Sequence, residues 1–311
     1  MTKKPKRSRC PRNGERRWGR GVKQISCQSF NEYMLKGKNN NFPSLLALEE
    51  PEAHLHPTAI RAISELIQNL PSQTIVTSHS GDFISSVPLT SIRRVYKKNG
   101  ETFIGRISDN KLEPREINSF EFNIKCNKGS FLFSDYWILV EGESDYLFVS
   151  SVLSSLRDKL TNLSYSIITI ARFGGSAPYV KIAESLGIIW FLFVDGDDSG
   201  KNYIQNAIKA SENYNIDEDR IVQLEQKCLE YFLWDSGFSD VFENIVGDKY
   251  INALKLKNIS NIQDAILETK KIKENKFFIA NEIANKIKIS NNIPEKFSDL
   301  INKINKTLGS I

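Results

Sequence analysis

Residues 136–145 read YWILVEGESD, an apolar run over Tyr136–Val140 that passes directly into acidic residues. A short apolar run of this kind is typical of a buried strand in a parallel sheet. Apolar residues then return at helical spacing over residues 147–156. The stretch predicts a strand that ends at Glu141, a turn, and a helix with Asp145 in its first turn, where a carboxylate also suits the helix dipole.

A second apolar run, IIWFLFV over Ile188–Val194, ends in the same way on Asp195 and Asp197. Ligands of an open α/β sheet gather at the carboxyl ends of its parallel strands. We therefore expect Glu141, Asp145, Asp195 and Asp197 to converge. Crowded carboxylates repel one another unless a cation lies between them, and hard oxygen ligands select Mg²⁺ or Mn²⁺. The alternative is two ordinary α/β turns with solvated acidic side chains.

This pattern resembles the Toprim domain, which occurs in topoisomerases, bacterial primases and OLD-family nucleases. The strand-Glu-Gly-x-x-Asp element comes first, Gly174-Gly175 follows, and the Asp-x-Asp of residues 195–197 comes last, in the motif order of that domain. Predicted strands at 136–140, 165–170, 188–194 and 220–224 alternate with helices, which indicates a parallel sheet. We expect the Toprim domain to occupy residues 135–240.

The composition allows two modest domains, with 311 residues and 40% apolar content. The net charge of +5 is mild, and residues 1–17 read as a basic, unstructured arm. Four cysteines show no C-x-x-C spacing, which favours a reduced cytoplasmic protein. No apolar run has membrane-spanning length, so we expect no membrane association.

Upstream, the apolar run Leu45–Leu48 ends on Glu49 and Glu50, which resembles a Walker B strand of an ABC-type ATPase. The resemblance implies that Glu49 holds Mg²⁺ and Glu50 polarises the attacking water. His79, at the end of the next predicted strand, resembles the switch histidine of the same enzymes. We interpret His54 and His56 as loop residues rather than metal ligands.

The stretch LEEPEAHLHP with the later TSHS closely resembles the ATPase half of OLD-family proteins. Gly21, in a segment that we predict to begin a helix, resembles a residue of that family's degenerate signature loop. No G-x-x-x-x-G-K-[ST] phosphate-binding motif is present in the sequence. Residues 18–112 are therefore expected to be the carboxyl-terminal half of an ABC-type ATPase domain, which uses ATP only if another chain supplies a Walker A motif. The chain as a whole is interpreted as the carboxyl-terminal part of an OLD-type protein.

Three further segments complete the predicted organisation. Two strands over residues 91–112 form a hairpin turned at Asn99-Gly100. Residues 113–134 are expected to be a linker, and residues 241–311 a helical, lysine-rich extension. Glu230 resembles a later acidic position of OLD Toprim domains, and Lys276 resembles the family's carboxyl-terminal lysine, which stabilises the scissile phosphate.

The resemblance implies an OLD-family DNA endonuclease, similar to the nuclease subunit of Gabija phage-defence systems, that cleaves by two-metal hydrolysis. Glu141, Asp195 and Asp197 would hold one Mg²⁺ or Mn²⁺ ion, and Asp145 with Glu230 would help hold the second. Glu141, Asp195, Asp197 and Lys276 are the candidate catalytic residues. The expected partners are DNA and either further copies of the chain or an ATPase. The alternatives are a non-catalytic DNA- or partner-binding remnant and an ATPase subunit of the repair or recombination type.

Overall fold

The computed structural model describes residues 17–18, 22–25, 45–98, 100–107, 112–211, 219–257 and 259–309. The chain divides into two compact units, which are described separately. The first comprises the described residues up to Pro88 together with Ile124–Ser130, and the second comprises Leu89–Asn123 and the described residues from Phe131 onward. The basic arm expected over residues 1–17 lies almost entirely outside the described residues.

A four-stranded sheet in the order β1-β2-β3-β4 forms the centre of the first unit. Its elements are β1 (Arg17–Trp18), β2 (Val22–Ile25), β3 (Leu45–Glu49), α2 (Pro57–Gln68), β4 (Gln73–Thr77) and α3 (Gly81–Ile84). Strands β2, β3 and β4 run parallel, whereas β1 pairs antiparallel with β2. Alternate residues of β3, Leu46 and Leu48, pack against the apolar side of α2 because successive side chains of a strand point to opposite faces.

The helix predicted to begin at Gly21 is wrong over Val22–Ile25, which form β2 in register with Leu45–Leu48 of β3. Lys23 and Gln24 are compatible with either conformation, and hydrogen bonding to a neighbouring strand decides between the two. His56 caps α2 by accepting a hydrogen bond from Thr58 N, as expected of a loop residue.

A four-stranded sheet in the order β10-β9-β7-β8 forms the centre of the second unit, and its strands run parallel, as the sequence predicts. Its strands are β7 (Tyr136–Val140), β8 (Tyr165–Thr169), β9 (Ile189–Val194) and β10 (Ile221–Gln223). Helices connect them: α5 (Glu143–Ser155), α6 (Ser176–Leu186) and α7 (Asp198–Ala210), with α9 (Leu229–Leu233) after β10. Every residue of β7 is buried, because helices cover both faces of the sheet.

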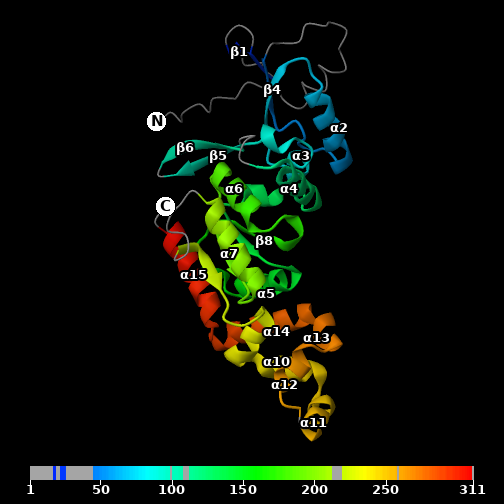
Figure 1. Ribbon diagram of the computed structural model, residues 1–311. Helices are drawn as coiled ribbons and strands as arrows, with labels where there is room; N and C mark the ends of the chain where they lie inside the picture. The colour runs from blue at the N-terminus through cyan, green and yellow to red at the C-terminus, as the bar shows by residue number, and fades with distance from the viewer. Residues whose placement is uncertain are drawn as a thin grey trace, which may run out of the picture. The chain divides into compact units, whose positions relative to one another are not determined.

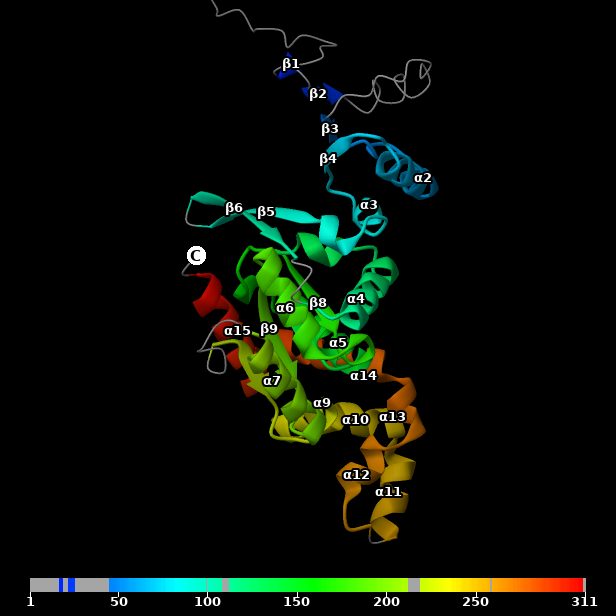
Figure 2. The ribbon, with the colours of Figure 1, turned by 45° about the horizontal axis from the view of Figure 1, so that its top comes forward.

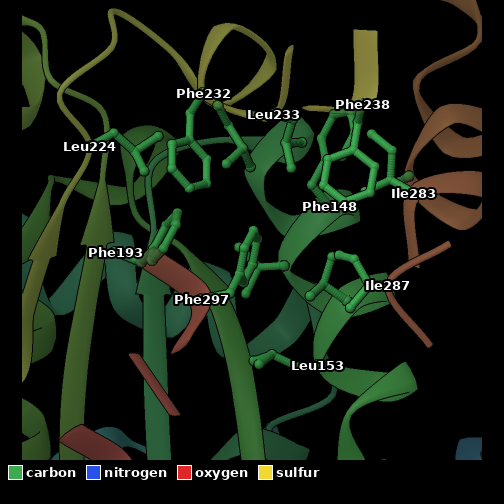
Figure 3. Packing of buried hydrophobic residues seen from close by; sticks show 14 of the residues in the cluster. Phe148, Leu153, Phe193, Leu224, Phe232, Leu233, Phe238, Ile283, Ile287 and Phe297 are labelled. Carbon is green, nitrogen blue, oxygen red and sulfur yellow. The ribbon is translucent and has the colours of Figure 1, made fainter. Parts of the chain in front are cut away.

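The carboxyl-terminal helices complete the core of this unit. They are α10 (Ser239–Val246), α11 (Asp248–Leu256), α12 (Ile262–Leu267), α13 (Lys270–Glu274), α14 (Lys276–Ser290) and α15 (Glu295–Leu308). Helix α14 lies beside α5 in both views (Figure 1, Figure 2). Phe297 of α15 stacks on Phe193 of β9, at a centroid distance of 5.4 Å, next to Phe232 (Figure 3). The lysine-rich extension therefore shares one apolar core with the sheet.

The segment expected to be a linker, residues 113–134, instead contains α4 (Pro114–Cys126) and the short helix η2 (Ser130–Phe133). Phe120 of α4 packs against Tyr179 and Phe131, and Trp137 of β7 donates a hydrogen bond to Phe131 O at 2.8 Å. The linker prediction is therefore wrong. Polar residues interrupt the apolar pattern of α4. The sequence alone therefore does not show which of its side chains are buried, whereas the tertiary contacts do.

The predicted hairpin is present as β5 (Arg93–Lys98) and β6 (Glu101–Arg106), paired antiparallel. Gly105 lies against Leu186 so closely that an added Cβ would meet the Leu186 backbone at 2.6 Å. The hairpin thus packs on the end of α6, within the second unit. Among the described residues, no helix is both long enough and apolar enough to cross a membrane.

Candidate functional site

The carboxyl ends of β7 and β9 bring Glu141 and Asp195 together. The two strands are neighbours in parallel register, with Val140 opposite Phe193. Glu141 Oε1 accepts a hydrogen bond from Asp195 N at 2.9 Å. The predicted convergence of these two strand ends is therefore present, with the Glu141 carboxylate bound directly to the backbone of the other strand.

Asp145 lies in the first turn of α5, on the same edge of the sheet. Its Oδ2 accepts a hydrogen bond from Gly142 N at 2.8 Å, which ties the carboxylate to the turn that follows β7. Only 8% of Asp145 is exposed, so it is not a solvated surface residue.

Asp197 forms the N-cap of α7 by accepting a hydrogen bond from Gly200 N at 2.8 Å. The start of this helix lies very close to the other carboxylates. A Cβ added at Gly200 would meet Asp195 O at 2.1 Å and Glu141 Oε1 at 3.1 Å. Only glycine at position 200 allows this approach of α7 to the strand ends.

Burial and mutual repulsion raise the pKa values of these carboxyl groups. Burial raises the pKa of Glu141 to about 7, with Asp197 and Asp145 adding repulsion and the Asp195 N–H opposing it. Burial is also the largest cause at Asp195, where neighbouring carboxylates help raise the pKa to about 9. The pKa of Asp145 rises to about 6, mainly through burial. A charged cluster of this kind is costly without a compensating cation.

Glu230 and Lys276, more than 40 residues apart in sequence, join this edge as an ion pair. Glu230 is 7% exposed, and its Oε1 lies 2.6 Å from Lys276 Nζ. The contact is an ion pair rather than a well-aligned hydrogen bond, since Glu230 Oε1 has no hydrogen-bond partner among the described residues. Lys276 Nζ donates to Ser144 Oγ at 2.5 Å, and Glu230 contributes to the raised pKa of Asp145.

The donor set at this edge suits a hard divalent cation, because it consists of carboxylate oxygens. Lys276 pairs with one of them, Glu230. Among the residues that the structure describes, no group of three or more His, Cys, Asp and Glu side chains is arranged so that it could hold a metal ion as it stands. The carboxylates converge, but three of them also hold backbone N–H groups at strand and helix ends.

Tyr203 of α7 is a neighbour of this cluster that the sequence reasoning missed. Its ring lies against Gly175, where an added Cβ would meet Tyr203 Cε1 at 3.3 Å. Burial, followed by the negative charges of Glu141 and Asp197, raises the pKa of Tyr203. Nothing in the sequence marks a single tyrosine in an amphipathic helix as a residue of the site. The Gly174-Gly175 pair beside it, in contrast, is part of the motif order of the Toprim domain. Both glycines have positive φ, at 91° and 81°.

The candidate ATP-site residues lie in the first unit, at the carboxyl ends of β3 and β4. His79 Nε2 lies 3.8 Å from Glu50 Oε1, so the structure brings these two together. Glu49 is exposed at the end of β3, and Gly21 lies outside the described residues. Glu52 was not among the predicted residues, but it is buried and accepts a hydrogen bond from Ser78 Oγ across the two strand ends.

Two protein families match consecutive parts of the chain. Residues 21–130 match the family described as a protein of unknown function (DUF2813). Residues 132–197 match the family described as overcoming lysogenization defect protein-like, TOPRIM domain. The second match spans β7 to the N-cap of α7 and so contains Glu141, Asp145, Asp195 and Asp197.

Two curated proteins are similar to the chain. One is the uncharacterized protein YbjD of Escherichia coli (strain K12), 30% identical over 202 residues, which are 65% of this chain and 36% of that protein. The other is the Old nuclease of Escherichia phage P2, 26% identical over 190 residues, which are 56% of this chain and 31% of the nuclease. The matched region thus spans about a third of each relative.

Solved structures with a partial likeness include carboxyl-terminal regions of two OLD proteins. That of Burkholderia pseudomallei is 17% identical with a TM-score of 0.44, and covers 57% of this chain and 99% of its own. That of Xanthomonas campestris pv. campestris is 20% identical with a TM-score of 0.44, and covers 57% of this chain and 97% of its own.

Proposed function

We propose that the chain is a metal-dependent DNA endonuclease of the OLD family, and the match of residues 132–197 to the OLD-like Toprim domain supports the proposal. The observation that carries the proposal is the carboxylate cluster of half-buried Glu141 and Asp195 and buried Asp145 at the carboxyl edge of the parallel sheet. The raised pKa of each of these groups marks a place where a bound cation would relieve repulsion.

In this proposal, Glu141, Asp195 and Asp197 hold one Mg²⁺ or Mn²⁺ ion, and Asp145 with Glu230 helps hold a second. When bound, such ions supply the charge that activates water and stabilises the leaving oxygen of a phosphodiester. Lys276 supplies positive charge to the scissile phosphate. Its ion pair with Glu230 and its bond to Ser144 hold the ammonium group at this edge.

The proposal extends to DNA as the substrate and to regulation by ATP. Glu49, Glu50 and His79 resemble ATPase residues, but act on nucleotide only where a Walker A segment from another chain holds the phosphates. Further copies of the chain or an ATPase subunit are the proposed partners. The matched region covers about a third of the length of each relative. An activity of the whole relatives therefore enters here as a proposal for this chain.

Nicking of supercoiled plasmid in Mg²⁺ or Mn²⁺ tests the proposal. We expect Glu141→Gln to lower the nicking rate at least about a hundredfold, because the site loses one negative ligand. Glu143→Gln is the matched control, since Glu143 lies two residues away but is 71% exposed at its side chain and pairs with Arg172.

Equal nicking by wild type and Glu141→Gln would show that the cluster is not the catalytic centre. A wild-type chain that binds plasmid without nicking it in either metal would favour the non-catalytic DNA-binding alternative. Circular dichroism of each variant confirms that the second unit remains folded.

A further inference from the structure

Lys276 holds its ammonium group at the edge of the sheet where the carboxylates converge. Its Nζ lies 2.6 Å from Glu230 Oε1 and donates a hydrogen bond to Ser144 Oγ at 2.5 Å. Ser144 directly precedes Asp145 in the first turn of α5. The ammonium group therefore bridges the helix that carries Glu230 and the helix that carries Asp145, the two carboxylates proposed to help hold the second ion.

The charge of this ammonium group acts on both carboxylates. Burial is the largest cause of the raised pKa of Asp145, the negative charge of Glu230 raises it further, and the positive charge of Lys276 opposes the increase. Asp145 is 8% exposed and Glu230 is 7% exposed. Because a buried negative charge is costly without a cation, the ammonium group meets part of the need that a metal ion would meet.

The contact between Lys276 and Glu230 is electrostatic rather than directional. Glu230 Oε1 has no hydrogen-bond partner among the residues that the structure describes, although Lys276 Nζ lies 2.6 Å from it. A metal ion binds a carboxylate oxygen without any donor alignment. Only 10% of the Glu230 side chain is exposed, so little room is left at this carboxylate for a second cation beside the ammonium group. A metal ion and the ammonium group would therefore compete for Glu230.

The backbone of α14 is anchored, whereas the side chain of Lys276 is free to rotate. Helix α14 lies beside α5 (Figure 1, Figure 2), and its Ile279, Ala280 and Ile283 are buried in the core. Lysine carries its charge on a flexible four-carbon stem, and 27% of this side chain is exposed. The ammonium group can therefore leave Glu230 by side-chain rotation alone, while the anchored helix keeps it near the same edge.

We propose that the Lys276 ammonium group occupies the second cation position of the metal-free protein, and that a divalent ion enters this position by displacing it. The inference rests on the proposed function for the identity of the metal ligands, and it adds that Lys276 changes its partner when the second ion binds. The displaced ammonium group then becomes available to an anion at the same edge. Of the two proposed ions, this one should bind more weakly, because its binding breaks the ion pair between Lys276 and Glu230.

Reductive methylation of the lysines in the full chain, read by peptide mass spectrometry without DNA, tests the inference. We expect Lys276 to react slowly in EDTA, because Glu230 and Ser144 hold its ammonium group, and several-fold faster in saturating Mg²⁺. Lys286 is the matched control on the same helix, since it pairs with Asp240 of α10, and its rate should not change with metal. An unchanged rate at Lys276 would overturn the exchange and would show that the ion pair is a permanent structural contact.

A Mn²⁺ titration of Lys276→Met provides a second readout. Methionine keeps an unbranched side chain but does not compete for Glu230, so the weaker ion should bind about tenfold more tightly than in wild type. Lys286→Met should bind Mn²⁺ as wild type does. Unchanged or weaker binding by Lys276→Met would contradict the competition. Repulsion from a stationary ammonium group would also weaken binding in wild type, but it would leave the methylation rate of Lys276 independent of metal.

Glu230→Gln tests the partner of the ammonium group. Glutamine carries no charge, so Lys276 should react quickly even in EDTA, and the weaker Mn²⁺ ion should no longer bind. Circular dichroism checks that the variant remains folded. Slow, metal-independent methylation of Lys276 in this variant would show that Glu230 does not hold the ammonium group, and would overturn the inference.

These readouts need neither DNA nor cleavage. A metal-dependent increase in Lys276 reactivity without any nicking would overturn the nuclease proposal and leave the exchange standing. Nicking that depends on Glu141, with a Lys276 reactivity that is indifferent to metal, would overturn the exchange alone.

Discussion

At the residue scale, carboxylates at strand ends connect the sequence to the candidate site. Glu141 and Asp195 each follow an apolar run, so the edge at which they meet could be predicted from the order of strands alone. The structure adds that Glu141 accepts a hydrogen bond from Asp195 N and that Asp145 is buried. The Glu141 and Asp145 carboxylates thus also bind local backbone N–H groups while they lie at the common edge.

The raised pKa values predict how the stability of the metal-free protein depends on pH. A folded carboxyl group with a raised pKa keeps its proton where the unfolded chain has lost it, so stability falls as pH rises. For Asp195 the fall extends from the ordinary aspartate value near 4 to about 9. In EDTA, we expect the melting temperature to fall by several degrees between about pH 5 and pH 9.

Asp195→Asn should flatten this dependence, because asparagine does not ionise. Asp198→Asn should leave it unchanged, since the Asp198 side chain is 96% exposed and pairs with Lys201. A melting temperature of the metal-free protein that rises with pH over this range would contradict the assigned cause of the pKa shifts. Identical profiles for wild type and Asp195→Asn would do so as well.

Residues that contact the site from helix faces could not be predicted so readily. Tyr203 reaches the cluster only because Gly175 leaves room for its ring. Glu52 becomes identifiable only when β3 and β4 place Ser78 beside it. Lys276 and Glu230 were proposed from a resemblance, and their pairing depends on how the carboxyl-terminal helices fold back onto α9.

At the scale of elements, the sequence predicted the parallel sheet of β7 to β10 and the β5–β6 hairpin, because apolar runs and turn residues mark both. The sequence did not predict the elements whose conformation depends on tertiary contacts. The helix α4 occupies a stretch whose polarity suggested a linker, and β2 occupies a stretch that suggested a helix start. In both, local propensity is weak and packing or strand pairing decides the conformation.

Phe120→Ala tests whether α4 belongs to the folded second unit. Phe120 is 1% exposed and packs against Phe131, Trp137 and Tyr179. Its loss should lower the free energy of unfolding by about 3–5 kcal/mol, through lost burial and the cavity left behind. Urea denaturation followed by tryptophan fluorescence measures the change, since Trp137 is one of the contacts.

Phe122→Ala is the control on the same helix, because Phe122 is 58% exposed, and we expect a change within about 0.5 kcal/mol. Equal and small effects of the two substitutions would indicate that the segment is a linker after all.

At the scale of the whole molecule, the described residues form two four-stranded sheets with different candidate chemistry. The second unit holds the carboxylate cluster, and its core includes helices from α5 to α15. The first unit brings Glu50 and His79 together at its own strand ends. The predicted division at residues 113–134 differs from the observed units, since Leu89–Asn123 belong with the second. The hairpin and the part of α4 up to Asn123 pack within the second unit, through side chains that the sequence pattern does not single out.

The most direct test of the central claim, that the β7 and β9 strand ends form a divalent-cation centre, is a Mn²⁺ titration followed by electron paramagnetic resonance. We predict that the wild-type chain binds about two Mn²⁺ ions. Asp195→Asn should bind fewer or bind them much more weakly, whereas Asp198→Asn should bind as wild type does. Wild-type binding by Asp195→Asn, or no Mn²⁺ binding by the wild-type chain, would contradict the account.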